Sequence, residues 1–374
     1  MVAVGAQLAR GCSSALDCSG ALGACMEGAC VCSPPWTGPL CATLNVSLPA
    51  ASSPTNGGLY TDPGGAWTWT ASPLQDDAGQ WHLYVDRFTN GCGVLHYCSN
   101  GEVAHAVAPS VLGPYTFSDL ALAPRAGLFD SGACNDVTAA RLPNGSWALF
   151  YMGAAEFGSA APNCTTAYDP AEGNRGSRRI GLALAASPFG PWARAAEPLL
   201  GPCTKGPHCW DDSDVSNPAP LLAEDGSVTL LYKGRGGKGQ HVGVAWARGL
   251  EGPWTRAPQP LPTLPGEDPW VWRTPDGLAH VLLHTGAGSG ATWGGSHAFS
   301  LDGGRTWNWT GVAYTGAVAW SNGSAGVLAR RERPQGVLDA QGRLAALFNA
   351  AQACIPAQDW GVACRSFSMA VPLL

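Results

Sequence analysis

Apolar and polar residues alternate in short runs along most of this chain, and turns rich in glycine and proline separate the runs. Such alternation predicts β-strands that each have one buried face. Four strand-and-turn segments read almost alike: VAHAVAPSVLGPYTF (103–117), IGLALAASPFGPWARA (180–195), VGVAWARGLEGPWTRA (242–257) and, more loosely, HAFSLDGGRTWNWT (297–310). A small sheet cannot bury both of its faces alone, so repeated sheets must pack side by side around an axis. The fold class expected is therefore all-β, a β-propeller.

The same pattern divides residues 61–374 into five blades, each expected to have four strands. The expected inner strands are 70–75, 134–142, 216–223, 267–273 and 331–338. A proline lies near the start of four of them, at Pro73, Pro218, Pro269 and Pro334, and Asp136 takes the equivalent place in the second blade. Proline is tolerated where a strand begins, because no ladder hydrogen bond is needed there.

Inner strands begin at one mouth of the axial channel, so the residues just before each proline should converge there. These residues are Ser72, Asn135, Asn217, Asp268 and Arg333, and Glu267 and Glu332 are adjacent to two of them. Polar groups from five distant segments meeting at one place indicate a ligand site.

Composition agrees with a folded all-β protein. Charged residues make up 13% of the 374 residues, hydrophobic residues 45%, and there are 50 glycines and 30 prolines. The formal net charge is −6 and no run of basic residues occurs, so nucleic acid is not an expected partner. No run of 18 apolar residues is present, so we expect no transmembrane segment.

Six of the 14 cysteines lie close together, at Cys12, Cys18, Cys25, Cys30, Cys32 and Cys41. A segment this short needs covalent staples to fold. Its end, CVCSPPWTGPLC, resembles the close of an EGF-like module, which we place at 10–42 and follow with a linker at 43–60. The resemblance implies the pairs Cys12–Cys25, Cys18–Cys30 and Cys32–Cys41. The alternative, a zinc knuckle, lacks a histidine ligand and paired C-x-x-C spacing, so no metal is expected.

Among the other cysteines, spacing favours local bridges Cys203–Cys209 and Cys354–Cys364. Cys92, Cys98, Cys134 and Cys164 allow three connectivities, which the sequence leaves open. So many cysteines predict an oxidising compartment, either outside the cell or in the secretory lumen. Glycosylation sequons at Asn45, Asn144, Asn163, Asn308 and Asn322 agree with a glycoprotein. The first ten residues are too short for a secretory signal peptide.

Several ordered motifs carry a second resemblance. They are SP (72–73), NPAPLL (217–222), EDPWVW (267–272), GGSHAFSLDG (294–303) and RRERPQ (330–335). Together they resemble the five-bladed propeller glycoside hydrolases, closest to family 43 within the wider group that holds families 32, 62, 68 and 117. The resemblance covers roughly residues 60–374 and implies hydrolysis of a glycosidic bond by carboxylates at the channel mouth, without a metal or organic cofactor.

Glycoside hydrolysis needs one protonated acid and one carboxylate that attacks the sugar or activates water. Asp268 and Glu332 are the expected pair, and Asp136 is a third candidate as base or charge modulator. Glu267 should point away from Asp268 in a regular strand, and replaces it if a bulge intervenes. Active members of the family typically have an aspartate in the first blade where this chain has Ser72, and Asn135 and Asn217 cannot exchange protons.

Other residues complete the expected substrate site. Trp69, Trp270 and Trp272 are candidates to stack a sugar ring, and His297, Arg331 and Arg333 are expected near the mouth. Each also has a structural interpretation: Asp268 as a turn cap, Glu332 in an ion pair with the flanking arginines, and His284 as a core histidine.

A further motif is shared with another class of β-propeller. Residues 300–307, SLDGGRTW, match the hairpin-locking Asp box of sialidases, but one copy does not indicate a six-bladed sialidase. The leading function is a secreted glycoside hydrolase acting on a cell-wall or extracellular polysaccharide. The alternative is a non-catalytic carbohydrate-binding or adhesion protein with a degenerate glycosidase site, in which the EGF-like module is a spacer. For either function, a protein partner that binds through the EGF-like module is a further expectation.

Overall fold

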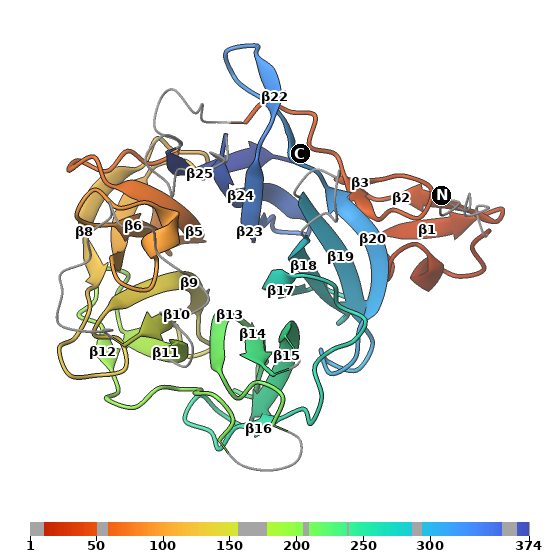
Figure 1. Ribbon diagram of the computed structural model, residues 1–374. Helices are drawn as coiled ribbons and strands as arrows, with labels where there is room; N and C mark the ends of the chain where they lie inside the picture. Colours follow the sequence, from red (N-terminus) through yellow and green to blue (C-terminus); the bar gives the residue numbers. More distant parts are fainter. Residues whose placement is uncertain are drawn as a thin grey trace.

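The computed structural model describes residues 11–50, 59–155, 178–204, 209–237, 239–285, 294–353 and 365–373. Five antiparallel sheets surround a common axis like the blades of a propeller (Figure 1). The described residues contain no α-helix, only the short 3-10 turns η1 (Ala15–Asp17) and η3 (Val94–His96). None of their helices is long and apolar enough to cross a membrane. The fold class predicted from the sequence is confirmed.

Within each blade the strands follow chain order from the axis outward. The first blade holds β5 (Trp67–Gln75), β6 (Trp81–Phe88), β7 (Gly101–Ala108) and β8 (Thr116–Leu122). The second holds β9 (Ala133–Arg141), β10 (Trp147–Ala154), β11 (Arg178–Ala185) and β12 (Ala193–Arg194). The third holds β13 (Asp214–Leu222), β14 (Val228–Gly236), β15 (Gly239–Ala247) and β16 (Thr255–Arg256). The fourth holds β17 (Glu267–Arg273), β18 (Ala279–Thr285), β19 (Gly294–Ser300) and β20 (Asn308–Tyr314).

The fifth blade corrects one expectation, because its described part has three strands and not four: β23 (Arg330–Leu338), β24 (Leu344–Gln352) and β25 (Ser366–Pro372). A separate hairpin, β21 (Ala317–Ala319) and β22 (Ala325–Val327), precedes it. Val318 and Trp320 of this region pack against Phe367 and other apolar residues of β25. The hairpin therefore covers apolar surface of the third strand.

The repeated turns share one conformation, which explains their repeated letters. Gly113, Gly190 and Gly252 have φ of +76°, +80° and +82°, where a side chain would be strained, and each precedes a cis proline. The Asp box locks the turn between β19 and β20. Asp302 Oδ1 accepts the backbone N–H groups of Arg305 and Thr306 at 3.0 and 2.9 Å. Its role in this fold is structural, as expected.

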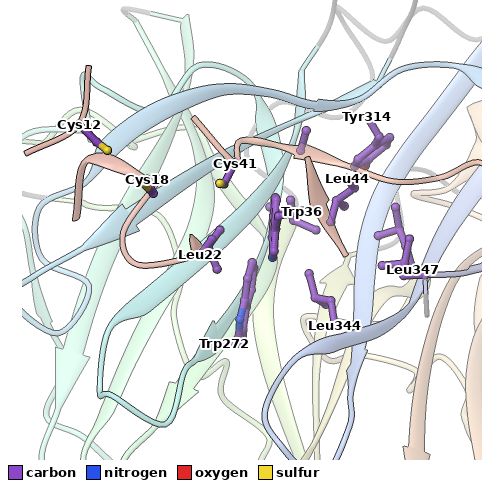
Figure 2. Packing of buried hydrophobic residues seen from close by; sticks show 13 residues of the cluster. Cys12, Cys18, Leu22, Trp36, Cys41, Leu44, Trp272, Tyr314, Leu344 and Leu347 are labelled. Atoms are coloured by element: carbon purple, nitrogen blue, oxygen red, sulfur yellow. The ribbon is translucent and has the colours of Figure 1, made fainter. Parts of the chain in front are cut away.

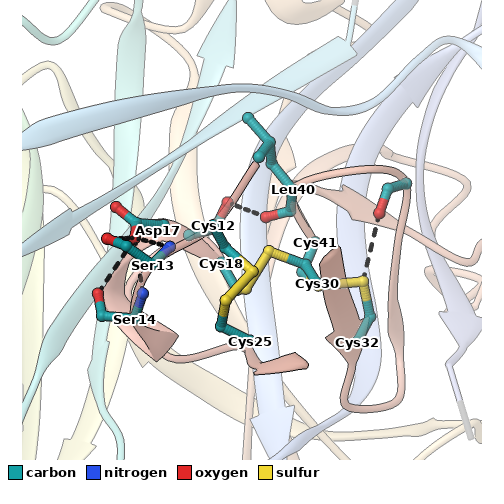
Figure 3. The surroundings of a disulfide bond; sticks show 12 residues. Cys12, Ser13, Ser14, Asp17, Cys18, Cys25, Cys30, Cys32, Leu40 and Cys41 are labelled. Carbon is teal, nitrogen blue, oxygen red and sulfur yellow. Dashed lines mark hydrogen bonds between the residues drawn. A yellow bond between two sulfur atoms is a disulfide. The ribbon is translucent and has the colours of Figure 1, made fainter. Parts of the chain in front are cut away.

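The three disulfides expected in the EGF-like module are present: Cys12–Cys25, Cys18–Cys30 and Cys32–Cys41 (Figure 3). They tie together η1, β1 (Gly23–Met26), β2 (Ala29–Cys32), β3 (Trp36–Thr37) and the start of β4 (Thr43–Leu44). Cys203–Cys209 is also confirmed, and Cys92 is disulfide-bonded. Cys164 and the expected Cys354–Cys364 bridge lie outside the described residues.

The EGF-like module packs against the fourth and fifth blades and shares a core with them. Trp36 stacks on Trp272 with ring centroids 6.5 Å apart (Figure 2). The ring centroid of Trp36 is also 4.8 Å from that of His297. Leu22 and Leu44 of the module join Leu344 and other blade residues in the same buried cluster. Parts of the 43–60 stretch, which was expected to be a linker, are also ordered: β4 pairs with β3, and the Ala50 N–H donates to Ala319 at 2.8 Å.

Candidate active site at the channel mouth

A bulge interrupts every inner strand at the same depth in the channel. In four blades the first residue of the bulge has left-handed backbone: Asp136, Asn217, Asp268 and Arg333, with φ of 53°, 54°, 55° and 51°. This conformation costs about 1–3 kcal/mol per non-glycine residue and concentrates at functional sites. The bulge turns four polar side chains toward one pocket.

The register in the first blade corrects one predicted site residue. Its bulge lies at Trp69 and Thr70, between the paired residues Thr68 and Ala71. Ser72 lies beyond the bulge, where its Oγ contacts Gln335 at 3.3 Å and it lines a different cavity of about 480 Å³ at the far end of the channel. The prediction that Ser72 shares the pocket is wrong, because Pro73 does not mark the bulge as the other three prolines do.

The pocket at the bulges has a volume of about 120 Å³. Eight of the predicted site residues line it: Trp69, Asn135, Asp136, Asn217, Glu267, Asp268, Glu332 and Arg333. Residues that the sequence did not single out also line it, among them Asp86, Tyr97, Arg178, Lys233 and Arg330. Asp86 and Lys233 lie on the second strands β6 and β14, where a charged residue directly after an apolar run (LYV and LLY) was the available signal.

Glu267 is the ionised carboxylate of the pocket. Its Oε2 pairs with Lys233 Nζ and accepts a hydrogen bond from Gln240 Nε2 at 2.9 Å. Burial by itself would raise the pKa of Glu267, but Lys233 and His284 outweigh it and hold that pKa well below its usual range. The side chain is 23% exposed, so the charge faces the pocket.

Asp268 has the opposite character although it is the next residue. Burial, and then the negative charge of Glu267, raise the pKa of Asp268 to about 7. Asn217 Nδ2 donates to its Oδ1, and the backbone N–H of Arg333 donates to its Oδ2 at 3.2 Å. Asp268 therefore holds a proton at mildly acidic pH in a fixed orientation.

Glu332 lies beside Asp268 from the neighbouring blade. Asp268, Glu332 and His284 each offer an atom within 4.8 Å of the others. Burial raises the pKa of Glu332. For His284, burial opposes charge, but the hydrogen bond to Glu267 and the charges of Glu332 and Asp268 raise its pKa. Two carboxyl groups this close favour sharing one proton over ionising together.

A second pair of acids lies across the channel. Asp136 Oδ1 is 3.5 Å from Arg333 Nε, and Arg333 Nη1 is 3.5 Å from Asp268 Oδ1, so the arginine connects the two sides. Asp86 is fully buried and its Oδ2 accepts the Asp136 N–H at 3.0 Å, which holds the bulge in place. Burial and the Asp136 charge raise the pKa of Asp86 to about 7.

Besides Ser72, three further predicted binding residues are not brought to the pocket, and the stacking candidate Trp270 lines the other cavity. Trp272 and His297 are buried beneath the EGF-like module, where His297 Nδ1 contacts Thr310 Oγ1 at 2.8 Å. Arg331 points the other way along β23 from Arg333, and its Nη1 donates to the carbonyl of Thr315 at 3.0 Å. Residues two apart share a face in a regular strand, so it is the bulge at Arg333 that separates the directions of the two arginines. The buried Arg331 packs over the ring of Tyr314.

The donor atoms of Asp268, His284 and Glu332 are close enough to surround one small cation. Positive charge is already supplied nearby, by Lys233 to Glu267 and by Arg333 to Asp268. Lys233 and Arg333 thus already neutralise part of the negative charge around these three groups. The cysteine trio Cys12, Cys18 and Cys30, which also lies close together, is consumed by disulfides.

Comparisons with known proteins agree with this architecture. A family model described as a Teneurin-like EGF domain matches residues 15–43. No curated protein sequence matches the chain. Among solved structures, Zg3597, a family 117 glycoside hydrolase of Zobellia galactanivorans, aligns with a TM-score of 0.57 and 16% identity, covering 82% of this chain and 84% of that chain.

Two further solved structures extend the likeness. An α-L-arabinofuranosidase from Lactobacillus brevis aligns with a TM-score of 0.54 and 10% identity over 84% of this chain and 92% of that one. A GH43_1 enzyme from Xanthomonas citri aligns with a TM-score of 0.54 and 16% identity over 85% and 90%. The chain therefore has the five-bladed propeller fold of these glycoside hydrolases, preceded by an EGF-like module.

Proposed function

We propose that this protein is a glycoside hydrolase that acts on an extracellular polysaccharide at the pocket formed by the inner-strand bulges. The observation that carries the proposal is the juxtaposition of Asp268 and Glu332, whose oxygens lie within 4.8 Å in a small polar pocket. A pair of carboxyl groups is the minimum that glycosidic hydrolysis requires.

The reaction divides the work between members of the pair. Asp268 holds a proton up to about neutral pH, so it gives this proton to the departing glycosidic oxygen while Glu332 acts on the sugar or on water. Asp136, paired with Arg333, modulates the charge of the pocket from the opposite side. Glu267 stays ionised beside Lys233 and favours the protonated form of Asp268.

The disulfide-stapled module supports an extracellular or secretory location, because such bridges persist only where thiols are oxidised. The described sequon residues Asn45, Asn144, Asn308 and Asn322 lie on the surface, as glycosylation requires. An EGF-like module beside the fourth blade also offers a surface for a protein partner.

The test is hydrolysis of a panel of nitrophenyl glycosides and plant or algal polysaccharides by the purified protein. Asp268→Asn and Glu332→Gln should each lower turnover by at least about 10³-fold, because each removes a proton-transferring or attacking group. Ser72→Ala is the matched control, since Ser72 lines the other end of the channel and should leave turnover unchanged. Equal turnover in all four proteins would overturn the assignment.

A second candidate is a non-catalytic carbohydrate-binding protein. It is favoured by the first blade, which places Trp69 and no carboxylate at its bulge. A glycan array probed with the wild-type protein discriminates between the two. Binding without any hydrolysis of the bound glycan supports the second candidate, whereas release of sugar from it supports the first.

A further inference from the structure

Trp69 occupies a special place in the ring of bulges. The corresponding residues of the other four blades are polar or charged, namely Asp136, Asn217, Asp268 and Arg333. Trp69 lines the same pocket as these four. The first blade therefore has a flat apolar side chain at the bulge position where each of the other four blades has a polar or charged one.

The tryptophan belongs to an apolar wall that the first blade contributes. Phe88 and Val94 are buried in one cluster with Trp69, and Tyr97 packs against that cluster. All of them line the pocket. Arg178 Nη1 donates to the Tyr97 hydroxyl at 2.9 Å, and Asn135 Nδ2 donates to the Tyr97 carbonyl, so the wall is held in place before any ligand arrives.

The opposite side of the pocket is charged. Glu267, Asp268 and Glu332 come from the fourth and fifth blades and face the same space. A sugar ring has the matching two-sided character, since its C–H groups form an apolar face and its hydroxyl groups project from the edge. Aromatic planes stabilise the first, and carboxylates accept hydrogen bonds from the second.

Size decides how much of a chain can enter. The pocket measures about 120 Å³. Pockets that enclose drug-sized molecules typically measure roughly 300–1,000 Å³, so this one accepts a single sugar ring and not two. The cavity at the far end of the channel, about 480 Å³, is separate, because Ser72, Gln335 and Thr138 form a hydrogen-bonded layer across the axis.

We propose that Trp69 is the platform for one terminal sugar ring and that the protein is exo-acting, releasing monosaccharides from chain ends. Release of monosaccharides rests on the proposed hydrolase function. Binding of a single sugar ring at Trp69 does not depend on that function. Trp69 binds the ring and takes no part in proton transfer. The wall and the small volume together exclude the interior of a polysaccharide chain.

Product sizing tests the mode of action. Hydrolysis of a polysaccharide that the protein cleaves should yield monosaccharide from the first time points, while the length of the remaining polymer falls slowly. Early appearance of a ladder of oligosaccharides would overturn exo-action and leave the proposed hydrolase intact.

Substitution tests the platform. Trp69→Ala should raise KM at least tenfold on the best nitrophenyl glycoside with little change in kcat, and Trp69→Phe should restore most of the binding. Trp270→Phe is the matched control, because Trp270 follows the bulge of β17 and lines the other cavity. A loss in kcat alone, or a KM for Trp69→Phe as high as that for Trp69→Ala, would overturn the role of Trp69.

A binding measurement separates this inference from the proposed function. Calorimetry of the Asp268→Asn protein with free monosaccharides and linear trisaccharides reads binding without turnover. The monosaccharide should bind within threefold of the matching trisaccharide, and Trp69→Ala should abolish both. If the sugars bind in this way but the wild type hydrolyses none of its substrates, the proposed hydrolase function is contradicted and the single-ring site stands. If the trisaccharide binds much more tightly than the monosaccharide, the single-ring site is contradicted.

Discussion

Glu267 and Asp268 are adjacent in sequence, yet both side chains face the same pocket and their pKa values move in opposite directions. In a regular strand neighbouring side chains point to opposite faces. The bulge of β17 removes that alternation, because Glu267 pairs with His284 while the next paired residue is Trp270. Two adjacent carboxyl groups thereby come to differ in charge, one paired with Lys233 and the other desolvated.

Glu267→Gln should lower the free energy of unfolding at pH 7 by about 3–5 kcal/mol, because it leaves the buried Lys233 without its partner charge. Denaturant titration measures the effect. The low pKa of Glu267 means that its contribution is present above the unfolded pKa of 4.5 and is lost as pH falls. The difference between variant and wild type should therefore shrink toward pH 3, and a constant difference would contradict the ion pair.

Asp268→Asn should flatten the pH dependence of stability between about pH 4 and pH 7. The folded pKa of about 7 exceeds the unfolded value of 3.8, so the folded protein retains a proton that the unfolded chain has released. Stability from this group is thus complete below pH 4 and declines as pH rises to 7. Thermal melts at several pH values measure the slope, and Ser72→Ala, which removes no titrating group, should keep the wild-type slope.

The spacing of Asp268 and Glu332 predicts retention of anomeric configuration. Their oxygens lie within 4.8 Å. Retaining enzymes hold their carboxyl groups about 5–5.5 Å apart, whereas inverting enzymes need about 6.5–9.5 Å for the attacking water. Proton NMR of the first product formed reads the anomer directly. An inverted product would show that a more distant carboxylate, such as Asp136, serves as the base.

Trp36→Ala should weaken the docking of the EGF-like module. Trp36 is 5% exposed and stacks on Trp272, and burying such a ring contributes about 3–5 kcal/mol. Limited proteolysis should cut the module faster in the variant while the propeller keeps its melting temperature. Trp309→Ala is the matched control, because Trp309 is 51% exposed on β20 and should change stability by less than about 0.5 kcal/mol.

Local patterns in the sequence were sufficient for the blades and the EGF-like module. Strand alternation, the glycine-proline turns around Gly113, Gly190 and Gly252, and the Asp box at 300–307 each encode their conformation within a few residues. The module disulfides followed from the resemblance of 30–41 to EGF-like modules and are confirmed. The strands, the turns and the Asp box depend on chain-local geometry, so a single sequence is enough to predict them, whereas the disulfide pairs needed the resemblance.

Membership of the site depended on tertiary structure. Proline spacing located the bulges at Asn217, Asp268 and Arg333 but misplaced the first blade by three residues, from Trp69 to Ser72. A shift of strand register moves a side chain to the other face of the sheet or to another position along the channel, and the local sequence pattern does not reveal such a shift. Asp86, Lys233 and His284 reach the bulges from second strands, across the sheet. The sequence determined which residues could carry the chemistry. Only the packing of five blades around one axis decided which of them line the same pocket and shift one another's pKa values.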